Sequence, residues 1–443
     1  MKEVKLQKHP AYKDSGVEWL GEIPEHWEVK KLKMITSFIN RGVTPNYVEN
    51  SNYKVINQAT FSKGYFDLLN IKFTKDKDFS GLNFSKGIVE RNDILLASTG
   101  GGVLGKVAFV DFDDNTFQAD SHVTIIRGTE PEFMSKYYYY ILSISYELIN
   151  GILAQGSTNQ TELQRDWLIN FKFPVPTFSE QTTISAYLDH KTAQIESAIG
   201  IKQKQIELLK ERRQILIHRA VTRGLNPNVK LKDSGLEWIG EIPEGWEVVP
   251  MIKYASRVDY RGKTPEKVDS GIILVTTKNI KGGKIDYDIS KEFVLEKDYA
   301  AIMSRGLPEI GDILFTMEAP LGMAAVVDNT DVAIAQRIIK FHFDDKVFNS
   351  YFVNQSIQSE YFQKILQREA TGSTAQGIKA SKLHKLKIIK PPLKEQIEIV
   401  SDIETNSLKI STAISLKEKE IEKLKEYKSV LINAAVSGKI KVG

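Results

Sequence analysis

Residues 14–29 read DSGVEWLGEIPEHWEV, and residues 233–248 read DSGLEWIGEIPEGWEV. Thirteen of the 16 positions are identical at an offset of 219. Self-similarity at a fixed spacing indicates a repeat architecture, in which each copy is one structural module. We therefore expect two copies of one module in tandem rather than one large core.

Shorter motifs continue the repeat through both halves of the chain. They occur in the same order and at offsets close to the first one. The matched pairs are RGxTP at 41–45 and 261–265, DIL at 93–95 and 312–314, GST at 156–158 and 372–374, and PxxxEQ at 176–181 and 391–396. The repeat therefore covers essentially the whole chain.

Each copy ends in a segment with a helical apolar stripe. The spacing between successive apolar positions is 7, 4, 7, 3, 7 and 4, which keeps them on one face of an α-helix. The second copy repeats the stripe at a constant offset of 215. The stripes are Leu188, Ile195, Ile199, Ile206, Leu209, Leu216 and Ala220, and Ile403, Ile410, Ile414, Ile421, Leu424, Leu431 and Ala435. Both helices need an apolar partner, and the simplest partner is the other helix.

The ends of these helices carry conventional signals. Two prolines precede each helix, as expected where a helix must start afresh. Gly224 and Gly438 follow as C-terminal stops. We expect the first helix at 183–222, and its 40 residues would measure about 60 Å at 1.5 Å per residue.

The composition narrows the class of protein. At 443 residues the chain exceeds one ordinary core, and it has no apolar run of the ~18 residues that a membrane span needs. The charged N-terminal segment lacks the apolar core of a signal peptide, and cysteine is absent, so we expect a cytoplasmic protein. The net charge of +4 is compatible with a nucleic-acid partner without requiring one.

Between the repeated segment and the long helix, each copy shows short β-rich runs and then a helical run. The runs at 53–58, 93–97 and 106–111 are separated by glycine and Asn-Asp turns. A helix is expected at 132–150, with a weaker counterpart at 348–366. Its four tyrosines at 137–140 are interpreted as core rather than as a base-stacking ladder. Each module is thus α+β and about 150 residues long.

The most enzyme-like segment is TGGGVLGKV at 99–107. It matches GxGxxG and most of a Walker A loop, but Val107 stands where Ser or Thr would hold magnesium. A strand follows it, whereas phosphate loops lead into a helix N-terminus. The second copy, TMEAPLG at 316–322, lacks the glycines. We interpret the segment as a strand-turn-strand whose tip varies between the copies.

No other catalytic or metal motif is seen in the sequence. The seven histidines include no pair at metal-ligand spacing, so we expect no metal site. The motifs of a restriction-type nuclease centre and the Asn-Pro-Pro-aromatic motif of an amino-methyltransferase are missing, and KPPL at 390–393 lacks the asparagine. We therefore expect no catalytic residue. The charged runs 202–213 and 417–428 alternate in sign, which favours a solvated or partner-facing helix edge over direct DNA binding.

The order of these motifs resembles that of the DNA-specificity subunits of type I restriction-modification enzymes. The resemblance is carried by WxGEIPxxWE at 19–28 and 238–247, the RGxTP turns, the DIL strands, the GST loops and the PxxxEQxxI helices. Each motif is loose by itself, but the duplicated order is highly specific. The resemblance covers essentially the whole chain.

The resemblance implies an α+β fold with two tandem α/β target-recognition domains and two long antiparallel, coiled-coil-like helices in a pseudo-two-fold repeat. Each domain would read one half of a bipartite asymmetric site on double-stranded DNA. The implied partners are two modification (methyltransferase) subunits and the restriction (motor-nuclease) subunits. AdoMet, ATP and Mg²⁺ would belong to those partners, and no cofactor would belong to this chain.

The repeat and the resemblance together divide the chain into six segments. These are a conserved segment at 1–26, a target-recognition domain at 27–175, a long helix at 176–224, a linker repeating the first segment at 225–245, a second target-recognition domain at 246–390 and a second long helix at 391–443. The two target-recognition domains share the repeated motifs but differ in sequence between them. We therefore expect the two domains to read different half-sites.

Polar residues in glycine-flanked loops are the candidate DNA contacts. Asn and Gln can bind adenine through two hydrogen bonds, Arg and Lys can reach guanine or phosphate, and small loops let amides approach phosphate. The first domain offers Arg41, Thr44, Asn57, Gln58, Ser98, Thr99, Lys106, Gly156, Ser157, Thr158 and Gln160. The second offers Arg261, Lys263, Thr264, Thr277, Lys278, Asn279, Gly372, Ser373, Thr374 and Gln376. The alternative is a solvated turn at Arg41 and Arg261 and a turn cap at Asn57.

Two rival functions are a solitary DNA methyltransferase or nuclease with its own recognition domains, and a coiled-coil adaptor without DNA contact. The missing catalytic motifs argue against the first. The second would leave two large variable domains without a purpose.

Overall fold

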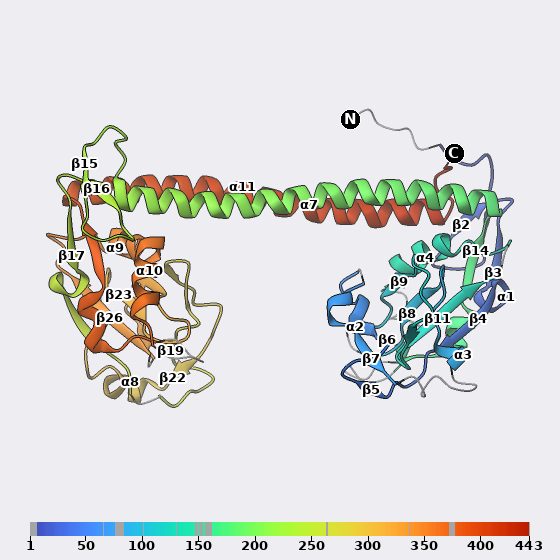
Figure 1. Cartoon of the computed structure of the whole chain (residues 1–443), viewed down its shortest axis with the longest axis horizontal. Helices are drawn as coiled ribbons and strands as arrows, with labels where there is room; N and C mark the ends of the chain where they lie inside the picture. The colour runs from blue at the N-terminus through green and yellow to red at the C-terminus, as the bar shows by residue number, and fades with distance from the viewer. Residues whose placement is uncertain are drawn as a thin grey trace. The chain divides into compact units, whose positions relative to one another are not determined.

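The computed structural model describes residues 7–64, 66–75, 84–100, 102–129, 131–146, 149, 154–155, 162–262, 265–335, 337–371 and 377–442. The chain divides into two compact units (Figure 1). Unit 1 is Met1–Ile201 with Lys419–Gly443, and unit 2 is Lys202–Glu418. Each unit therefore holds one copy of the repeat and a part of each long helix.

The duplicated segment folds in the same way in both units. The Asp14 carboxylate accepts a hydrogen bond from the Gly16 amide at 2.9 Å, and Asp233 accepts one from Gly235 at 2.9 Å. Both glycines have a positive φ, at 64° and 75°, which glycine adopts without strain. The strands are β1 (Tyr12–Asp14), β2 (Glu22–Pro24) and β3 (Glu28–Lys31) in unit 1, and β15 (Leu231–Asp233), β16 (Glu241–Pro243) and β17 (Glu247–Pro250) in unit 2.

Unit 1 contains two four-stranded sheets. The first has the order β4-β11-β8-β9 and is antiparallel, and the second has the order β10-β6-β7-β5 with a parallel pair, β10 and β6. Its elements are α1 (Leu32–Ile35), β4 (Thr36–Arg41), β5 (Tyr47–Val48), β6 (Tyr53–Ile56), α2 (Gln58–Phe61), η1 (Leu68–Asn70), β7 (Lys72–Thr74), α3 (Phe84–Gly87), β8 (Ile94–Ala97), β9 (Val107–Phe109), β10 (Phe117–Ala119), β11 (Val123–Gly128), α4 (Ser135–Ile144), β12 (Ala154–Gln155), β13 (Glu162–Leu163), α6 (Arg165–Asn170) and β14 (Lys172–Val175).

Unit 2 repeats this plan. One sheet has the order β18-β26-β23-β24, and the other has the order β22-β19-β25 with β19 and β25 parallel. Its elements are η4 (Met251–Tyr254), β18 (Ala255–Asp259), β19 (Ile272–Val275), β20 (Ile280–Lys281), β21 (Lys284–Ile285), β22 (Phe293–Val294), α8 (Glu296–Ile302), β23 (Ile313–Thr316), β24 (Ala324–Val326), β25 (Val332–Ile334), β26 (Ile338–Phe343), α9 (Ser350–Gln358), α10 (Glu360–Glu369), η5 (Ala380–Lys385) and β27 (Lys387–Lys390).

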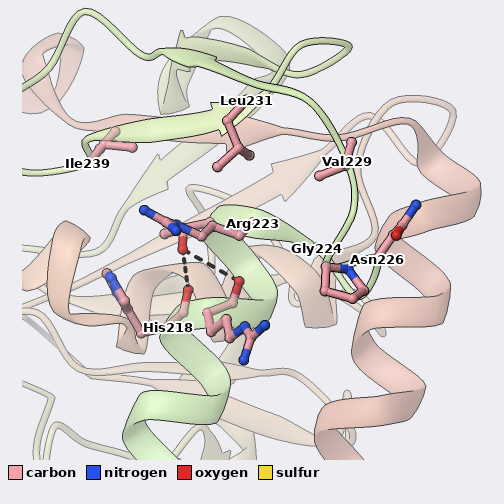
Figure 2. Close-up of a pocket in the computed structure, with 10 residues that line it drawn as sticks. His218, Arg223, Gly224, Asn226, Val229, Leu231 and Ile239 are labelled. Carbon is pink, nitrogen blue, oxygen red and sulfur yellow. Dashed lines mark hydrogen bonds between the residues drawn. The ribbon is translucent and has the colours of Figure 1, made fainter.

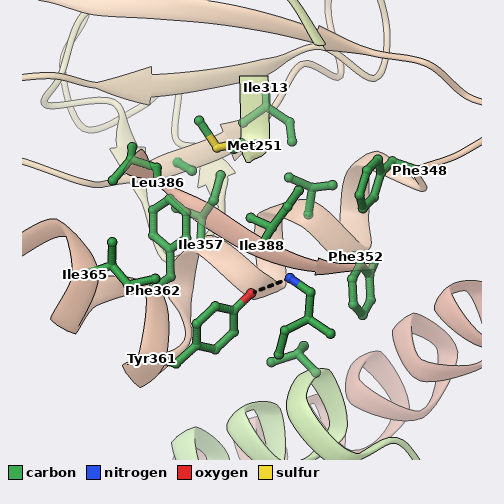
Figure 3. Packing of buried hydrophobic residues seen from close by; sticks show 14 of the residues in the cluster. Met251, Ile313, Phe348, Phe352, Ile357, Tyr361, Phe362, Ile365, Leu386 and Ile388 are labelled. Carbon is green, nitrogen blue, oxygen red and sulfur yellow. Dashed lines mark hydrogen bonds between the residues drawn. The ribbon is translucent and has the colours of Figure 1, made fainter. Parts of the chain in front are cut away.

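The large core of unit 2 packs α9 and α10 against the sheet strands (Figure 3). Phe352 and Phe362 are fully buried in it. Tyr361 is equally buried, and its hydroxyl accepts a hydrogen bond from the Ile389 amide at 3.4 Å. Because that partner lies in β27, the strand that leads into the second long helix, the core joins the module to its helix.

The two long helices are α7 (Phe178–Arg223) and α11 (Leu393–Val436), and parts of both lie side by side in each unit (Figure 1). In unit 1, Lys428 Nζ donates to Glu196 Oε1 at 2.6 Å. In unit 2, Arg213 Nη1 donates to Ser411 Oγ at 3.4 Å. The offset of 215 relates Glu196 to Ser411 and Arg213 to Lys428, so the two contacts are copies of one another.

Several sequence predictions are confirmed. Each copy is α+β, and the glycine-rich segment joins β8 to β9 as a strand-turn-strand, as its counterpart joins β23 to β24. Three of the four tyrosines, Tyr137, Tyr138 and Tyr140, are buried at 0%, 0% and 5% exposure, so they belong to the core. Among the described residues, no helix combines the length and apolar character needed to cross a membrane.

Three helix boundaries differ from prediction. α7 begins at Phe178 rather than 183, because Thr177 and Glu180 form a capping box at its start. The Thr177 amide donates to Glu180 Oε2 at 3.1 Å, and the Glu180 amide donates to Thr177 Oγ1 at 3.3 Å. α4 covers Ser135–Ile144 of the expected 132–150. The helix expected at 348–366 is two helices, because Ser359 is extended with φ −72° and ψ 154°.

Candidate nucleic-acid interface

Four strand ends meet at one edge of the antiparallel sheet in unit 1. β4 and β8 end there, at Arg41 and Ala97, and β9 and β11 begin there, because neighbouring strands are antiparallel. We call the exposed and half-buried residues at this place the unit 1 edge: Arg41, Thr44, Gln58, Thr99, Lys106, His122 and Glu162. Loops that are far apart in the sequence therefore converge on one surface.

The polar groups of the unit 1 edge are held by internal contacts. The Arg41 guanidinium bonds the Glu162 carboxylate and donates to the Leu163 carbonyl at 3.1 Å. Thr99 Oγ1 lies 2.8 Å from His122 Nδ1, and Lys106 Nζ donates to the Ser62 carbonyl. A DNA phosphate or base would therefore replace the carboxylate and carbonyl partners of these cations rather than meet them unbound.

Gln58 lies beside the glycine-rich turn. A Cβ atom at Gly100, where φ is +92°, would lie 3.2 Å from Gln58 Nε2, so the turn passes close over this amide. Gln58 Oε1 is buried without a hydrogen-bond partner among the described residues. Thr44 is exposed at the same edge.

Two candidates in unit 1 have structural roles instead. Ser98 is fully buried, and its hydroxyl bonds the Leu96 carbonyl at 3.1 Å and the Thr124 hydroxyl, so Ser98 cannot reach DNA and is withdrawn as a contact. Asn57 caps α2: its Oδ1 accepts from the Thr60 amide at 3.1 Å, and the Asn57 amide donates to Thr60 Oγ1 at 3.2 Å. The turn-cap alternative therefore describes Asn57.

Unit 2 has the equivalent edge, at the ends of β18 and β23 and the starts of β24 and β26. Arg261 grips the Asp259 carboxylate through Nη2 at 2.6 Å and Nε at 2.9 Å. Burial by itself would raise the pKa of Asp259. The hydrogen bonds from Arg261 lower this pKa by more than burial raises it, so it lies below its ordinary value. Arg305 Nη1 donates to the Asp259 and Arg261 carbonyls at 2.7 and 2.6 Å. The Arg261 side chain is thereby fixed at the edge.

The residues after β19 correspond to those after β6. Lys278 is 70% exposed and its Nζ lies 3.3 Å from Glu292 Oε1, while Thr277 is half-buried. Asn279 is fully buried, and its amide donates to the Asp286 and Ser290 carbonyls at 2.9 Å each. Asn279 is therefore withdrawn as a DNA contact because its hydrogen bonds close a loop within the unit.

Sequence reasoning missed two residues at equivalent places. His122 lies between β10 and β11, and Arg337, 215 residues later, lies between β25 and β26. Arg337 has φ +77°, its side chain is 53% exposed and it lies 3.9 Å from Glu318. The signal available in the sequence was the offset of 215 between the copies, which relates the residue just before β11 to the residue just before β26.

The remaining candidates lie outside the described residues. They are Gly156, Ser157, Thr158, Gln160, Lys263, Thr264, Gly372, Ser373, Thr374 and Gln376. Their proposed contact with DNA stays a prediction.

The residues of the predicted helix faces are buried or half-buried. Leu188, Ile195, Ile199, Ile206, Ile403, Ile410, Ile414, Ile421 and Leu431 are between 0 and 8% exposed. Leu209, Leu216 and Leu424 are half-buried. The stripe is therefore the buried face of each long helix along its length.

The fold and the duplicated polar edges define a class of tandem-repeat α+β proteins with paired long helices, and comparison with known proteins identifies its family. The model of the type I restriction modification DNA specificity domain matches residues 24–208 and 261–426. The chain belongs to this family, the specificity subunits of type I restriction-modification enzymes.

Relatives and solved structures span nearly the same length. The chain is 25% identical to the MjaVIII specificity subunit of Methanocaldococcus jannaschii over 95% of this chain and 94% of that protein. It is 22% identical to the EcoKI specificity subunit of Escherichia coli over 87% and 82%. A chain from structural work on complex assembly and conformational transition of the type I R-M system superposes with a TM-score of 0.68 at 13% identity, covering 94% of this chain and 98% of that one. The HsdS subunit from Thermoanaerobacter tengcongensis superposes at 0.50, with 12% identity and the same coverage.

Proposed function

We propose that this chain reads a bipartite, asymmetric site on double-stranded DNA, with unit 1 reading one half-site and unit 2 the other. The observation that carries the proposal is the pair of equivalent edges. Thr99 and His122 in unit 1 stand where Glu318 and Arg337 stand in unit 2, and Arg41 ends β4 while Arg261 follows the end of β18, on sheets of the same order. A common frame with different polar groups predicts different half-sites.

We further propose that the chain is not itself catalytic. Its long helices would bind two modification (methyltransferase) subunits and, through them, the restriction (motor-nuclease) subunits. AdoMet, ATP and Mg²⁺ would serve those partners. The family membership, the alternating charge along both helices and the lack of catalytic motifs in the sequence support this role.

The half-site assignment can be tested by sequencing methylated bases in cells that carry the chain and its modification subunit. Arg41→Ala would relax or weaken recognition in one half of the methylated motif, and Arg337→Ala in the other, because each good base contact contributes about 1–3 kcal/mol of discrimination. Lys33→Ala is the matched control, because Lys33 is an exposed cation on α1, at the end of β4 opposite Arg41 and outside both long helices. An unchanged motif in both edge variants, or a change in both halves from one of them, would contradict the assignment.

Catalysis by the chain alone is tested separately. The purified chain is incubated with radiolabelled AdoMet and DNA that carries the motif, with and without the modification subunit. We expect methylation only when both are present, and methylation by the isolated chain would overturn the non-catalytic role.

A further inference from the structure

Unit 1 brings together two imidazoles and a carboxylate that the sequence keeps apart. His9 precedes β1, His26 lies between β2 and β3, and Glu180 lies in the first turn of α7. One possible ligand atom from each lies within 4.8 Å of the other two. His26 Nε2 is already 2.8 Å from Glu180 Oε1. The three groups therefore surround one point.

We propose that His9, His26 and Glu180 bind one Zn²⁺ ion. Two imidazoles and one carboxylate are a donor set that zinc accepts, with bonds of about 2.0–2.2 Å and water as the fourth ligand. The ion would take the position between His26 Nε2 and Glu180 Oε1, and the neutral His26 imidazole would keep its one proton on Nδ1. Small side-chain rotations would bring the three donor atoms to bonding distance from their present separation of at most 4.8 Å.

The His9 ring is placed for this role. The residue is only 9% exposed, and its ring packs edge-on to Trp27 at 5.9 Å and to Tyr12 at 6.2 Å between centroids. Its backbone amide donates to the Tyr12 hydroxyl at 3.0 Å, which holds the residue in place. Within the described part of the chain, neither ring nitrogen of His9 has a hydrogen bond, so a lone pair is available to a metal.

The Glu180 carboxylate is oriented by a second layer of contacts. Trp27 Nε1 donates to its Oε1 at 3.3 Å, and Thr177 Oγ1 donates to its Oε2 at 2.8 Å. Such outer contacts fix ligand direction in metal sites. The side chains of His26 and Glu180 are 50% and 27% exposed, so a hydrated ion can reach them from solvent.

Unit 2 shows that the frame does not require the histidines. Trp246 Nε1 donates to Glu395 Oε2 at 3.0 Å, as Trp27 does to Glu180. The positions 219 residues after His9 and His26 are Asn228 and Gly245. The carboxylate is therefore common to both units, and the two imidazoles occur in unit 1 alone. The proposed Zn²⁺ site replaces the expectation from the sequence that the chain has no metal site.

The position of the ion indicates what it does. Glu180 begins the long helix, and His9 belongs to the segment before β1, where Tyr12 Oη also donates to the Gly438 carbonyl at 3.2 Å. Zn²⁺ would tie this N-terminal segment to the start of α7 and so stabilise one end of unit 1.

Isothermal titration of the EDTA-treated, dialysed full chain with ZnCl₂ tests the proposal. We expect one equivalent of Zn²⁺ and a rise in the melting temperature of the chain. His9→Asn and His26→Gly install the residues that unit 2 already accommodates, and each would weaken zinc binding by more than about tenfold, the least that even outer contacts contribute.

A second readout separates this site from the five other histidines. Co²⁺ bound at the site would give visible absorption bands that vanish in the His9→Asn, His26→Gly double variant, while circular dichroism confirms that the variant is folded. A wild-type chain that binds no Zn²⁺, or a folded double variant that binds Zn²⁺ as tightly as the wild type, would overturn the proposal.

Discussion

Gln181 and Gln396 make the same three hydrogen bonds, one set in each unit. The Gln181 amide donates to the Glu132 and Pro176 carbonyls at 3.0 Å each and accepts from the Met134 amide at 2.8 Å. The equivalent bonds of Gln396, to Val347, Pro391 and Asn349, are 2.9, 2.8 and 2.9 Å long. Both side chains are fully buried. The repeated Glu-Gln pair therefore anchors the start of each long helix to its module. The glutamate accepts a hydrogen bond from the tryptophan of the duplicated segment, and the glutamine bonds backbone groups.

Gln181→Ala would destabilise unit 1 by roughly 3 kcal/mol, because a buried polar group left without its partner costs about 1–3 kcal/mol and three are affected. Hydrogen exchange on the full chain measures this at the Met134 amide, which would lose protection. The Asn349 amide in unit 2 serves as an internal reference and would keep its protection. Gln203→Ala is the control on the same helix, because Gln203 is exposed. Equal protection of Met134 in wild type and Gln181→Ala would show that the bond contributes nothing.

The glycines that follow the long helices tolerate substitution unequally. Gly438 has φ +73°, and a Cβ atom there would lie 2.4 Å from Pro24 Cδ. Gly224 has φ +72°, but its nearest neighbour would be Trp246 at 3.1 Å. Gly224→Ala therefore costs about 1–2 kcal/mol, from the left-handed backbone, whereas Gly438→Ala adds a steric clash and costs more.

Gly200→Ala is the matched control, and we expect it to raise the free energy of unfolding rather than lower it. Gly200 is a helical residue of α7 whose added Cβ would meet nothing within 4 Å. Alanine there would stabilise the helix by about 1 kcal/mol. Urea unfolding of the three variants gives the order directly, and a Gly438→Ala protein no less stable than Gly224→Ala would contradict the predicted contact with Pro24.

A buried aspartate pairs with a cation on the neighbouring strand in both units, Asp93 with Arg127 in unit 1 and Asp312 with Lys340 in unit 2. Asp312 is fully buried and accepts from Lys340 Nζ at 2.7 Å and from His342 Nδ1 at 2.8 Å. Lys340 is only 5% exposed. Asp312→Ala would leave this ammonium buried without its counterion and cost about 3–5 kcal/mol.

Adding Lys340→Met to Asp312→Ala should recover most of that loss, because an apolar replacement of a buried pair is often close to neutral. The free energy of unfolding of the single and double variants, compared in a double-mutant cycle, measures the coupling. Glu207→Ala, which breaks the exposed pair with Lys204, would change stability by less than about 1 kcal/mol. A double variant as unstable as Asp312→Ala alone would exclude charge burial as the cause.

The long helices could be predicted because their apolar stripe is a local, periodic property of the sequence. The stripe does not reach the first turn of α7, whose residues are held by a capping box and by Gln181; the repeated PxxxEQ motif, which starts the long-helix segment at 176, is the signal that covers it. Sequence periodicity records which face of a helix is buried. It does not record hydrogen bonds to residues some 50 positions away.

The candidate edges were predicted only in part. Arg41, Thr99 and Lys106 were chosen as loop residues and do lie at one edge, because strand ends carry loops. Ser98 and Asn279 are candidates of the same kind, yet the prediction is wrong for both, because they are buried and bond Thr124 and Ser290 on other segments of their units. The His9, His26 and Glu180 cluster was missed for the same reason, since 154 residues separate His26 from Glu180.

We expect His218 to make the stability of unit 2 depend on pH. It lies near the end of α7 beside a pocket that Arg223, Asn226 and Ile239 also line (Figure 2). Burial lowers its pKa from the ordinary value of 6.5; Glu360 opposes the shift, and Lys364 and Arg223 add to it. Its Nδ1 is buried without a partner among the described residues. The neutral ring is therefore the form that the folded unit favours.

Because the folded pKa lies below the unfolded one, the folded state binds fewer protons and stability rises with pH. The contribution of His218 is complete above about pH 6.5, the unfolded value, and is lost as the pH falls through 6.5 toward the folded pKa. His218→Gln, which cannot be protonated, would flatten this part of the profile of unfolding free energy against pH between pH 7 and 5. Parallel profiles of wild type and variant over that range would show that the imidazole titrates alike in both states, and would remove His218 as the cause.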